Sequence, residues 1–252
     1  MKTVTYLTGK PTRLVVLDYG TFKVHANGRI IGIVGFLIET DRGEHVVIDT
    51  GFPAKYAYDM KRSTLEDHLE SFGEVLILTP DNLPLAQLGK AGVSEEDVTL
   101  FITSHTHIDH VGGLDLFPNA PMIVAKAERD LPKPLYWHKA QPLEWPDREY
   151  LVIEEDTQIG PGFEVLFVPG HAPGQLAFVI ELPETGTVLL TSDAISRESE
   201  PQEGYDGSFD PPAAAANAER ILKLAQERSA FVIYGHSPQQ WTTLRKSPDD
   251  YR

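Results

Sequence analysis

The chain has 252 residues and no cysteine, and its 22 basic and 37 acidic side chains give a formal net charge of −15 at pH 7. The length suffices for one large core, so we expect one domain over residues 1–252, and the lack of cysteine excludes disulfides and zinc–thiolate sites. A strongly negative field repels phosphate backbones and anionic lipid heads, which makes nucleic acid and membrane surfaces poor partner candidates.

The first residues predict an antiparallel meander. Apolar, β-branched runs at 13–18 and 29–39 are separated by the turn residues Asn27-Gly28, and a third strand is predicted at 45–49. That strand ends in Asp49-Thr50-Gly51. A carboxylate that leaves a strand beside a glycine either supports a site or caps a turn.

Between residues 53 and 103 the sequence predicts a variable segment, a helix and a buried strand. Residues 53–72 are polar and mixed, and we expect a mobile segment or short helix that covers a pocket. Leucines at helical spacing predict a helix over 82–91, which Gly92 ends. The apolar run 98–103 predicts a buried strand.

Three histidines and an aspartate follow this strand in Ser-His-Thr-His-Ile-Asp-His, residues 104–110. Alternate side chains of an extended chain face the same way, so His105 and His107 can converge on one point. The chain must then turn, which lets Asp109 and His110 offer a second position. Imidazole and carboxylate suit zinc and other borderline divalent metals, including manganese, iron and cobalt.

A short strand at 121–125 and the start of a helix at 127–130 are predicted next. Residues 131–150 are rich in proline and aromatic side chains without a clear period, which is typical of a pocket wall or surface loop. His138 lies in this stretch without a strand end before it, and we do not expect it to bind a metal.

The second half repeats the strand-loop pattern. Strands are predicted at 163–168, 176–182, 187–192 and 231–234, and the clearest helix covers 212–228. Three of these strands lead to a candidate ligand. With the first cluster, the candidates are five histidines and two aspartates, which are too many for one tetrahedral ion and about right for two: His105, His107, Asp109, His110, His171, Asp193 and His236.

This pattern resembles the metallo-β-lactamase superfamily over nearly the whole chain, because Asp49-Thr50-Gly51 also looks like that family's early strand-end aspartate. The resemblance implies an α/β fold, a four-layer αββα sandwich, with a dinuclear site along one edge of the sheets. It also implies the ligand sets: His105, His107 and His171 for the first metal, Asp109, His110 and His236 for the second, and Asp193 as the bridge.

The chemistry implied by the resemblance is hydrolysis. Two divalent cations, with Zn²⁺ as the first expectation, lower the pKa of a shared water and provide a bridging hydroxide at neutral pH. Asp109 could pass a proton to the leaving oxygen, and Asp49 would orient a histidine ligand.

Four other branches of the superfamily fit less well. Dizinc β-lactamases commonly use a cysteine ligand, and oxygen-reducing di-iron members have glutamate at the position of His107. Nucleic-acid hydrolases conflict with the negative charge. Glutathione-thioester hydrolases carry a helical C-terminal extension, whereas only a short segment follows His236.

The lactonase branch, which includes quorum-quenching N-acyl homoserine lactonases, fits best in size and ligand set. These enzymes generally have a tyrosine three residues beyond the bridging aspartate, where it assists at the substrate carbonyl. Here that position is Ser196, and Tyr205 and Tyr136 are the candidate substitutes.

We therefore expect a metal-dependent hydrolase that opens a lactone, with a small lactone or ester as its partner. The alternatives are another ester, thioester or phosphodiester hydrolase and a non-catalytic metal-dependent binding protein. The sequence shows neither a secretion signal nor an apolar run of roughly 20 residues, so we expect a cytoplasmic protein without a membrane partner. A homodimer remains an option.

Overall fold

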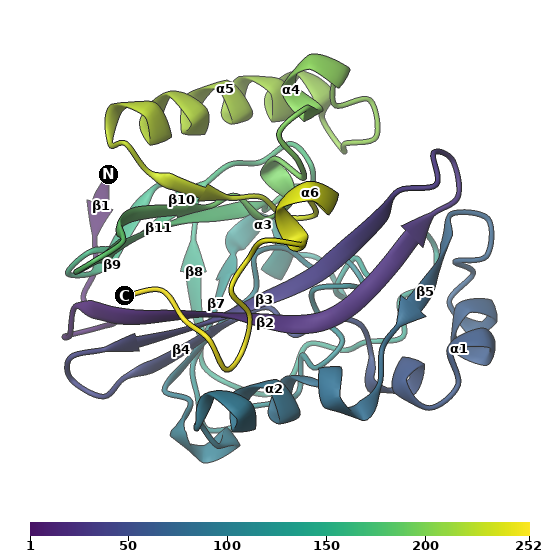
Figure 1. The fold of residues 1–252 in the computed structure, drawn as a ribbon, viewed down its shortest axis with the longest axis horizontal. Coiled ribbons are helices and arrows are strands. Elements are labelled where there is room, and N and C mark those ends of the chain that lie inside the picture. The colour runs from purple at the N-terminus through teal and green to yellow at the C-terminus, as the bar shows by residue number, and fades with distance from the viewer.

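The computed structural model describes residues 1–252 and places two mixed β-sheets face to face, with helices over the outer faces (Figure 1). The predicted αββα sandwich is thereby confirmed. The strand order is β5-β2-β3-β4-β6-β7-β8 in the N-terminal sheet and β1-β9-β10-β11-β12-β13 in the C-terminal sheet. Each half of the chain therefore builds most of one sheet.

The strands of the N-terminal sheet are β2 Pro11–Val24, β3 Ile30–Thr40, β4 His45–Ile48, β5 Gly73–Ile77, β6 Leu100–Ile102, β7 Met122–Ala125 and β8 Tyr150–Ile153. Those of the C-terminal sheet are β1 Lys2–Thr3, β9 Thr157–Gly160, β10 Phe163–Phe167, β11 Leu176–Leu182, β12 Gly186–Leu190 and β13 Phe231–Ile233. The α-helices are α1 Met60–Glu66, α2 Pro84–Ala91, α3 Lys126–Arg129, α4 Glu200–Glu203, α5 Pro211–Glu227 and α6 Pro238–Trp241. Short 3₁₀ turns are η1 Ala54–Ala57, η2 Pro80–Asn82, η3 Glu95–Asp97 and η4 Ser192–Ala194.

The pairing confirms the predicted meander, because β2, β3 and β4 are joined by antiparallel ladders. From β4 onward the ladders to β6, β7 and β8 are parallel. Parallel neighbours present their carboxyl ends at the same edge of the sheet, so the loops after β4 and β6 leave side by side. This edge carries Asp49 and the histidine cluster.

The sheets are held by three layers of apolar side chains. Along β2, Leu14 and Val16 face the layer between the sheets, whereas Val15 and Leu17 face the outer helices, as the period of two requires. On the other side of the molecule, Ile221 and its neighbours on α5 pack against the C-terminal sheet. Helices α2 and α5 thus bury an apolar face, which includes Leu88 on α2 and Ile221 on α5.

The helices follow their predicted signals. The prediction for 212–228 agrees with α5, which begins with Pro211 after the N-cap Asp210. The helix predicted for 82–91 is α2, and Gly92 ends it in the left-handed conformation at φ 86°. Of the two alternatives for 53–72, the short helix is observed as α1.

Several short elements lie outside the predictions. Strands β1, β5, β8 and β9 and helices α4 and α6 were not expected. The stretch before β8 is an irregular loop, as its composition indicates. It contacts the loop after β6 that carries the histidine cluster, through a β-bridge between His107 and Tyr136. No helix in the structure combines the length and the apolar character needed to cross a bilayer.

Close approach of two loops at the sheet edge makes Gly112 intolerant of a side chain. A Cβ at Gly112 would lie 2.1 Å from the carbonyl carbon of Phe52, and the Gly112 amide donates to the Gly51 carbonyl at 2.8 Å. Gly89, on α2, has open space around it.

We predict opposite effects of alanine at these two glycines. Gly112→Ala should lower the free energy of unfolding by about 3 kcal/mol through overpacking. Gly89→Ala should raise it by about 0.5–1 kcal/mol, because a helix interior favours alanine over glycine. Urea denaturation measures both. Equal stability of the two variants would contradict the close approach of the loops.

Candidate metal centre

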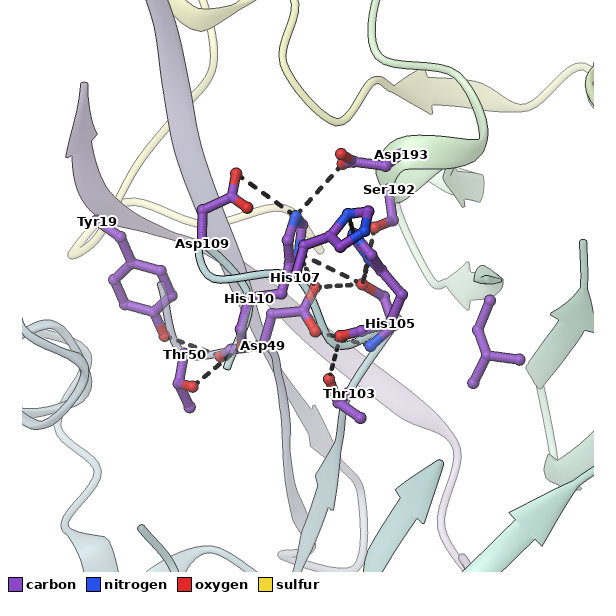
Figure 2. A network of polar contacts seen from close by, with 12 residues as sticks. Tyr19, Asp49, Thr50, Thr103, His105, His107, Asp109, His110, Ser192 and Asp193 are labelled. Carbon is purple, nitrogen blue, oxygen red and sulfur yellow. Dashed lines mark hydrogen bonds and ion pairs between the residues drawn. The ribbon is translucent and has the colours of Figure 1, made fainter. Parts of the chain in front are cut away.

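The structure brings all seven predicted ligands together where the loops of both sheets meet. Figure 2 shows five of them, His105, His107, Asp109, His110 and Asp193. The loop after β6 supplies four of the seven, and the loops after β10, β12 and β13 supply one each. Their ligand atoms form three groups in which every atom lies within 4.8 Å of the others: His105, His107 and His171; Asp109, His110 and His236; and His105, His110 and Asp193.

The first group consists of three imidazoles with facing ring nitrogens. His107 Nδ1 lies 3.0 Å from both His105 Nε2 and His171 Nε2. Burial lowers the pKa of all three, to about 3 for His107, so the neutral form that binds metals is favoured. A cation at the point where the three nitrogens converge would use their lone pairs together.

The second group combines two imidazoles with a carboxylate. Asp109 Oδ2 lies 3.7 Å from His110 Nε2 and 3.4 Å from His236 Nε2. Burial opposes the charged form of both histidines, but nearby carboxylates outweigh it: Asp109 and Asp193 raise the pKa of His110, and Asp193 leads in raising that of His236 to about 9. The field that attracts protons here also attracts a divalent cation, and the two compete.

Asp193 lies between the groups and turns one oxygen to each. Its Oδ2 is 3.3 Å from His171 Nε2, whereas its Oδ1 is 3.4 Å from His110 Nε2 and 3.1 Å from His236 Nε2. Burial alone would raise the pKa of this carboxyl, but His236, His110 and His171 together lower it well below the usual value. An ionised carboxylate in this position has the geometry of a bridge.

The chemistry of these side chains is suited to binding divalent cations. His110 Nε2 and Asp193 Oδ1 are buried polar atoms that no hydrogen bond satisfies. Unsatisfied buried polar groups are rare and costly in folded proteins, and a shared cation accounts for both. The donor set of imidazole nitrogens and carboxylate oxygens matches the same class of ion.

Three of the histidine rings are held by neighbouring groups through the ring nitrogen that faces away from the proposed metal positions. Asp49 Oδ2 lies 2.9 Å from His110 Nδ1, as expected for the predicted orienting carboxylate. Ser104 Oγ lies 3.2 Å from His105 Nδ1, and the Gly32 carbonyl lies 2.9 Å from His236 Nδ1. Such contacts fix ring orientation and tautomer.

Ser104 and Ser192 belong to this network and were not predicted. The Ser192 hydroxyl donates to Ser104 Oγ at 2.8 Å, and Ser104 donates its amide and its hydroxyl to Asp49, both at 2.7 Å (Figure 2). Ser104 is the first residue of the histidine cluster at 104–110, but only the folded structure shows that its partner is Ser192 from the other half of the chain.

A cavity of about 930 Å³ opens over the centre and includes His107, Asp109, His171, Asp193 and His236 in its lining. Part of the lining, called the aromatic side below, is formed by Phe22, Ile31, Leu69, Phe72 and Trp137. Another part is ionic: Arg197 pairs with Glu200 and Glu203, and Arg29 lies 3.6 Å from Glu203. The predicted pocket wall in 131–150 is present, since residues 135–138 line the cavity.

The residues considered for the substrate carbonyl are engaged or covered. Ser196 lines the cavity, and its amide donates to Glu200. The Tyr205 hydroxyl is buried without a partner, and burial raises its pKa to about 12. Tyr136 is 1% exposed, and burial and Asp67 raise its pKa. His138 lies on the cavity wall and belongs to none of the ligand groups.

Comparison with known proteins identifies the class. Residues 32–236 match the family model of the metallo-beta-lactamase superfamily, and the chain belongs to this superfamily. The resemblance predicted from the motifs is confirmed, and the membership places the chain among metal-dependent hydrolases.

The similar proteins narrow the branch to lactonases. An N-acyl homoserine lactonase of Bacillus cereus is 30% identical over 85% of this chain and 84% of its own length. The N-acyl homoserine lactonase AttM of Agrobacterium fabrum is 29% identical over 95% of this chain and 98% of its own length. A mutant of B. thuringiensis AiiA, solved with N-decanoyl-L-homoserine at its active site, has a TM-score of 0.83 and 27% identity and covers 97% of this chain and 100% of its own.

A second solved structure has the same score, identity and coverage. It is an N-acyl homoserine lactone hydrolase with the product N-hexanoyl-L-homoserine at its catalytic metal centre.

We predict that Asp49→Ala destabilises the protein strongly. The change leaves the Ser104 amide and hydroxyl and His110 Nδ1 without their acceptor in a buried site, where each unsatisfied group costs about 1–3 kcal/mol. The exposed N-cap change Asp210→Ala should cost only about 1 kcal/mol. Urea denaturation compares the two, and a similar loss for both would contradict the proposed importance of the network.

Proposed function

We propose that this protein is a dinuclear-metal hydrolase that opens the ring of an N-acyl homoserine lactone or a related small lactone, and that residues 1–252 act as one domain. The observation that carries the proposal is the position of Asp193, whose two oxygens face two separate ligand groups beneath one cavity. Bacterial lactonases similar over most of this chain support the substrate class.

In the proposed centre, His105, His107 and His171 hold one ion, Asp109, His110 and His236 hold the other, and Asp193 bridges them. We expect both ions to be Zn²⁺, because Zn²⁺ is bound by imidazole and carboxylate groups and its filled d shell imposes no coordination geometry. Two such ions supply a water of lowered pKa and a Lewis acid for the carbonyl.

The protein's own residues orient the reactants and move a proton. In lactone hydrolysis the water oxygen bonds to the carbonyl carbon, the ring C–O bond breaks, and the ring oxygen leaves as a hydroxyl. Asp109 lines the cavity beside His110 and His236, where its carboxyl can carry the proton from the water to that leaving oxygen. The products are a carboxylate and an alcohol, with one proton released to solvent at neutral pH.

The aromatic side of the cavity suits the acyl chain of such a substrate. Phe72 lies between Phe22 and Trp137, with ring centroids 5.8 Å and 4.7 Å apart. Phe72 stacks on Phe22 and is tilted against Trp137, and packed rings of this kind offer a large apolar surface with little freedom to lose on binding.

We predict that the zinc-loaded protein consumes base in a pH-stat when given N-acyl homoserine lactones. The alkali uptake reports one carboxylic acid per ring opened, and a chelator should abolish it until zinc is restored. A panel with simple lactones, linear esters and thioesters identifies the bond. If no compound turns over faster than with free zinc, the hydrolase proposal fails, and tight binding without turnover by calorimetry would favour the binding-protein alternative.

We also predict that Asp193→Ala lowers metal content and activity together. Without the bridge, bound metal should fall from about two ions per chain to one or none, and kcat/KM should fall by about 100-fold or more. Elemental analysis gives the stoichiometry, and His107→Ala should behave similarly. His45→Ala is the matched control, because its ring nitrogen contacts the backbone carbonyl of Asp97 away from the centre. Two ions per chain in Asp193→Ala would show that the bridge is misplaced.

A further inference from the structure

Glu128 is a fully buried carboxylate that none of the predicted roles uses. It lies in α3, is 0% exposed, and forms no salt bridge with any cation. A buried carboxylate without a cation is costly unless donors surround it. Its partners therefore identify what it does.

Those partners come from two ligand loops in different halves of the chain. The Thr106 hydroxyl donates to Glu128 Oε2, and the Gly174 amide donates to Glu128 Oε1 at 3.0 Å. Thr106 stands between His105 and His107, and Gly174 stands three residues after His171. One carboxylate thus joins the loops that carry the three histidines of the first ligand group.

The approach of the second loop to α3 is close enough to require glycine. A Cβ at Gly174 would lie 2.3 Å from Glu128 Cγ and 2.7 Å from Ala125 Cβ. On the other side, the Thr106 hydroxyl also accepts from the Leu135 amide at 3.0 Å. Both ends of the link are therefore fixed in space by further contacts.

The second ligand group has supporting contacts of its own. The Thr50 amide donates to the His110 carbonyl at 2.9 Å, and Asp49 holds the His110 ring. His236 is held by the Gly32 carbonyl from β3. None of these contacts passes through Glu128.

We propose that Glu128 is a positioning residue that sets the distance between His107 and His171 and thereby tunes the first metal position selectively. The inference rests on the proposed dinuclear function. Ionised glutamate offers an acceptor oxygen to each loop, whereas glutamine keeps the shape but offers one carbonyl oxygen and an NH₂ donor. Glu128→Gln should therefore loosen one of the two loops.

The test is a zinc titration of the whole protein with a competing chelator that resolves two dissociation constants. Glu128→Gln should raise one constant about 10-fold and leave the other unchanged. Thr106→Val removes the hydroxyl at the other end of the link and should also raise one constant and leave the other unchanged. Thr106→Ser keeps the hydroxyl and should bind zinc like the wild-type protein. The absorption spectrum of the cobalt-substituted protein should change in the bands of one ion only.

Gln87→Leu controls for general loss of stability, because buried Gln87 holds the Asp18 amide and the Asp81 carbonyl away from the centre. At a similar loss of melting temperature, this variant should keep both constants. The inference is overturned if both Glu128→Gln and Thr106→Val keep both constants, or if they raise both equally. A wild-type protein that binds fewer than two ions would overturn the dinuclear proposal itself.

Discussion

The structure around the centre depends on the burial of one carboxylate among imidazoles. Asp193 lies within 3.1–3.4 Å of nitrogens on His110, His171 and His236. A buried charge is tolerated only when opposite charge or donors surround it, so the three rings and the carboxylate must arrive together. Because they follow β6, β10, β12 and β13, they meet only when both sheets are packed. Formation of the centre and closure of the sandwich are therefore one event.

The loops at this edge also contain strain that the sheets must support. Asp49 and Ser192 adopt left-handed backbone conformations, with φ of 60° and 45°. For residues other than glycine, such conformations cost of order 1–3 kcal/mol and persist when the surroundings fix them. Here Ser104 fixes both, since it donates to Asp49 and accepts from Ser192. These two strained residues take part in the network that joins the two halves of the chain beneath the ligands.

The sequence predicted what depends on local pattern and missed what depends on encounters between distant segments. Strands β3 and β11 and helix α5 have long apolar periodicity, and their predictions agree with the structure. The strand predicted at 13–18 is present as part of β2, which extends from Pro11 to Val24. The edge strand β1 and its neighbour β9 are short and mixed in polarity, and they are stabilised by their ladder partners rather than by a strong pattern of their own. The seven candidate ligands were conspicuous as residue types at strand ends. Glu128 and Ser192 carry no such signal, since each acquires its partner only when two loops meet.

The departure at Ser196 changes how a lactone carbonyl could be stabilised on the proposed function. The Ser196 amide donates to Glu200, Tyr136 is buried beside Asp67, and the Tyr205 hydroxyl is covered by the surrounding protein. The Tyr205 hydroxyl is therefore closed off from the open cavity. On the proposed function, the ions that the seven ligands would hold would supply most of the stabilisation of charge on the carbonyl oxygen, at a site that is already polar and preorganised. The accuracy with which His107 and His171 are spaced consequently matters more here than in a site where a phenol shares this task.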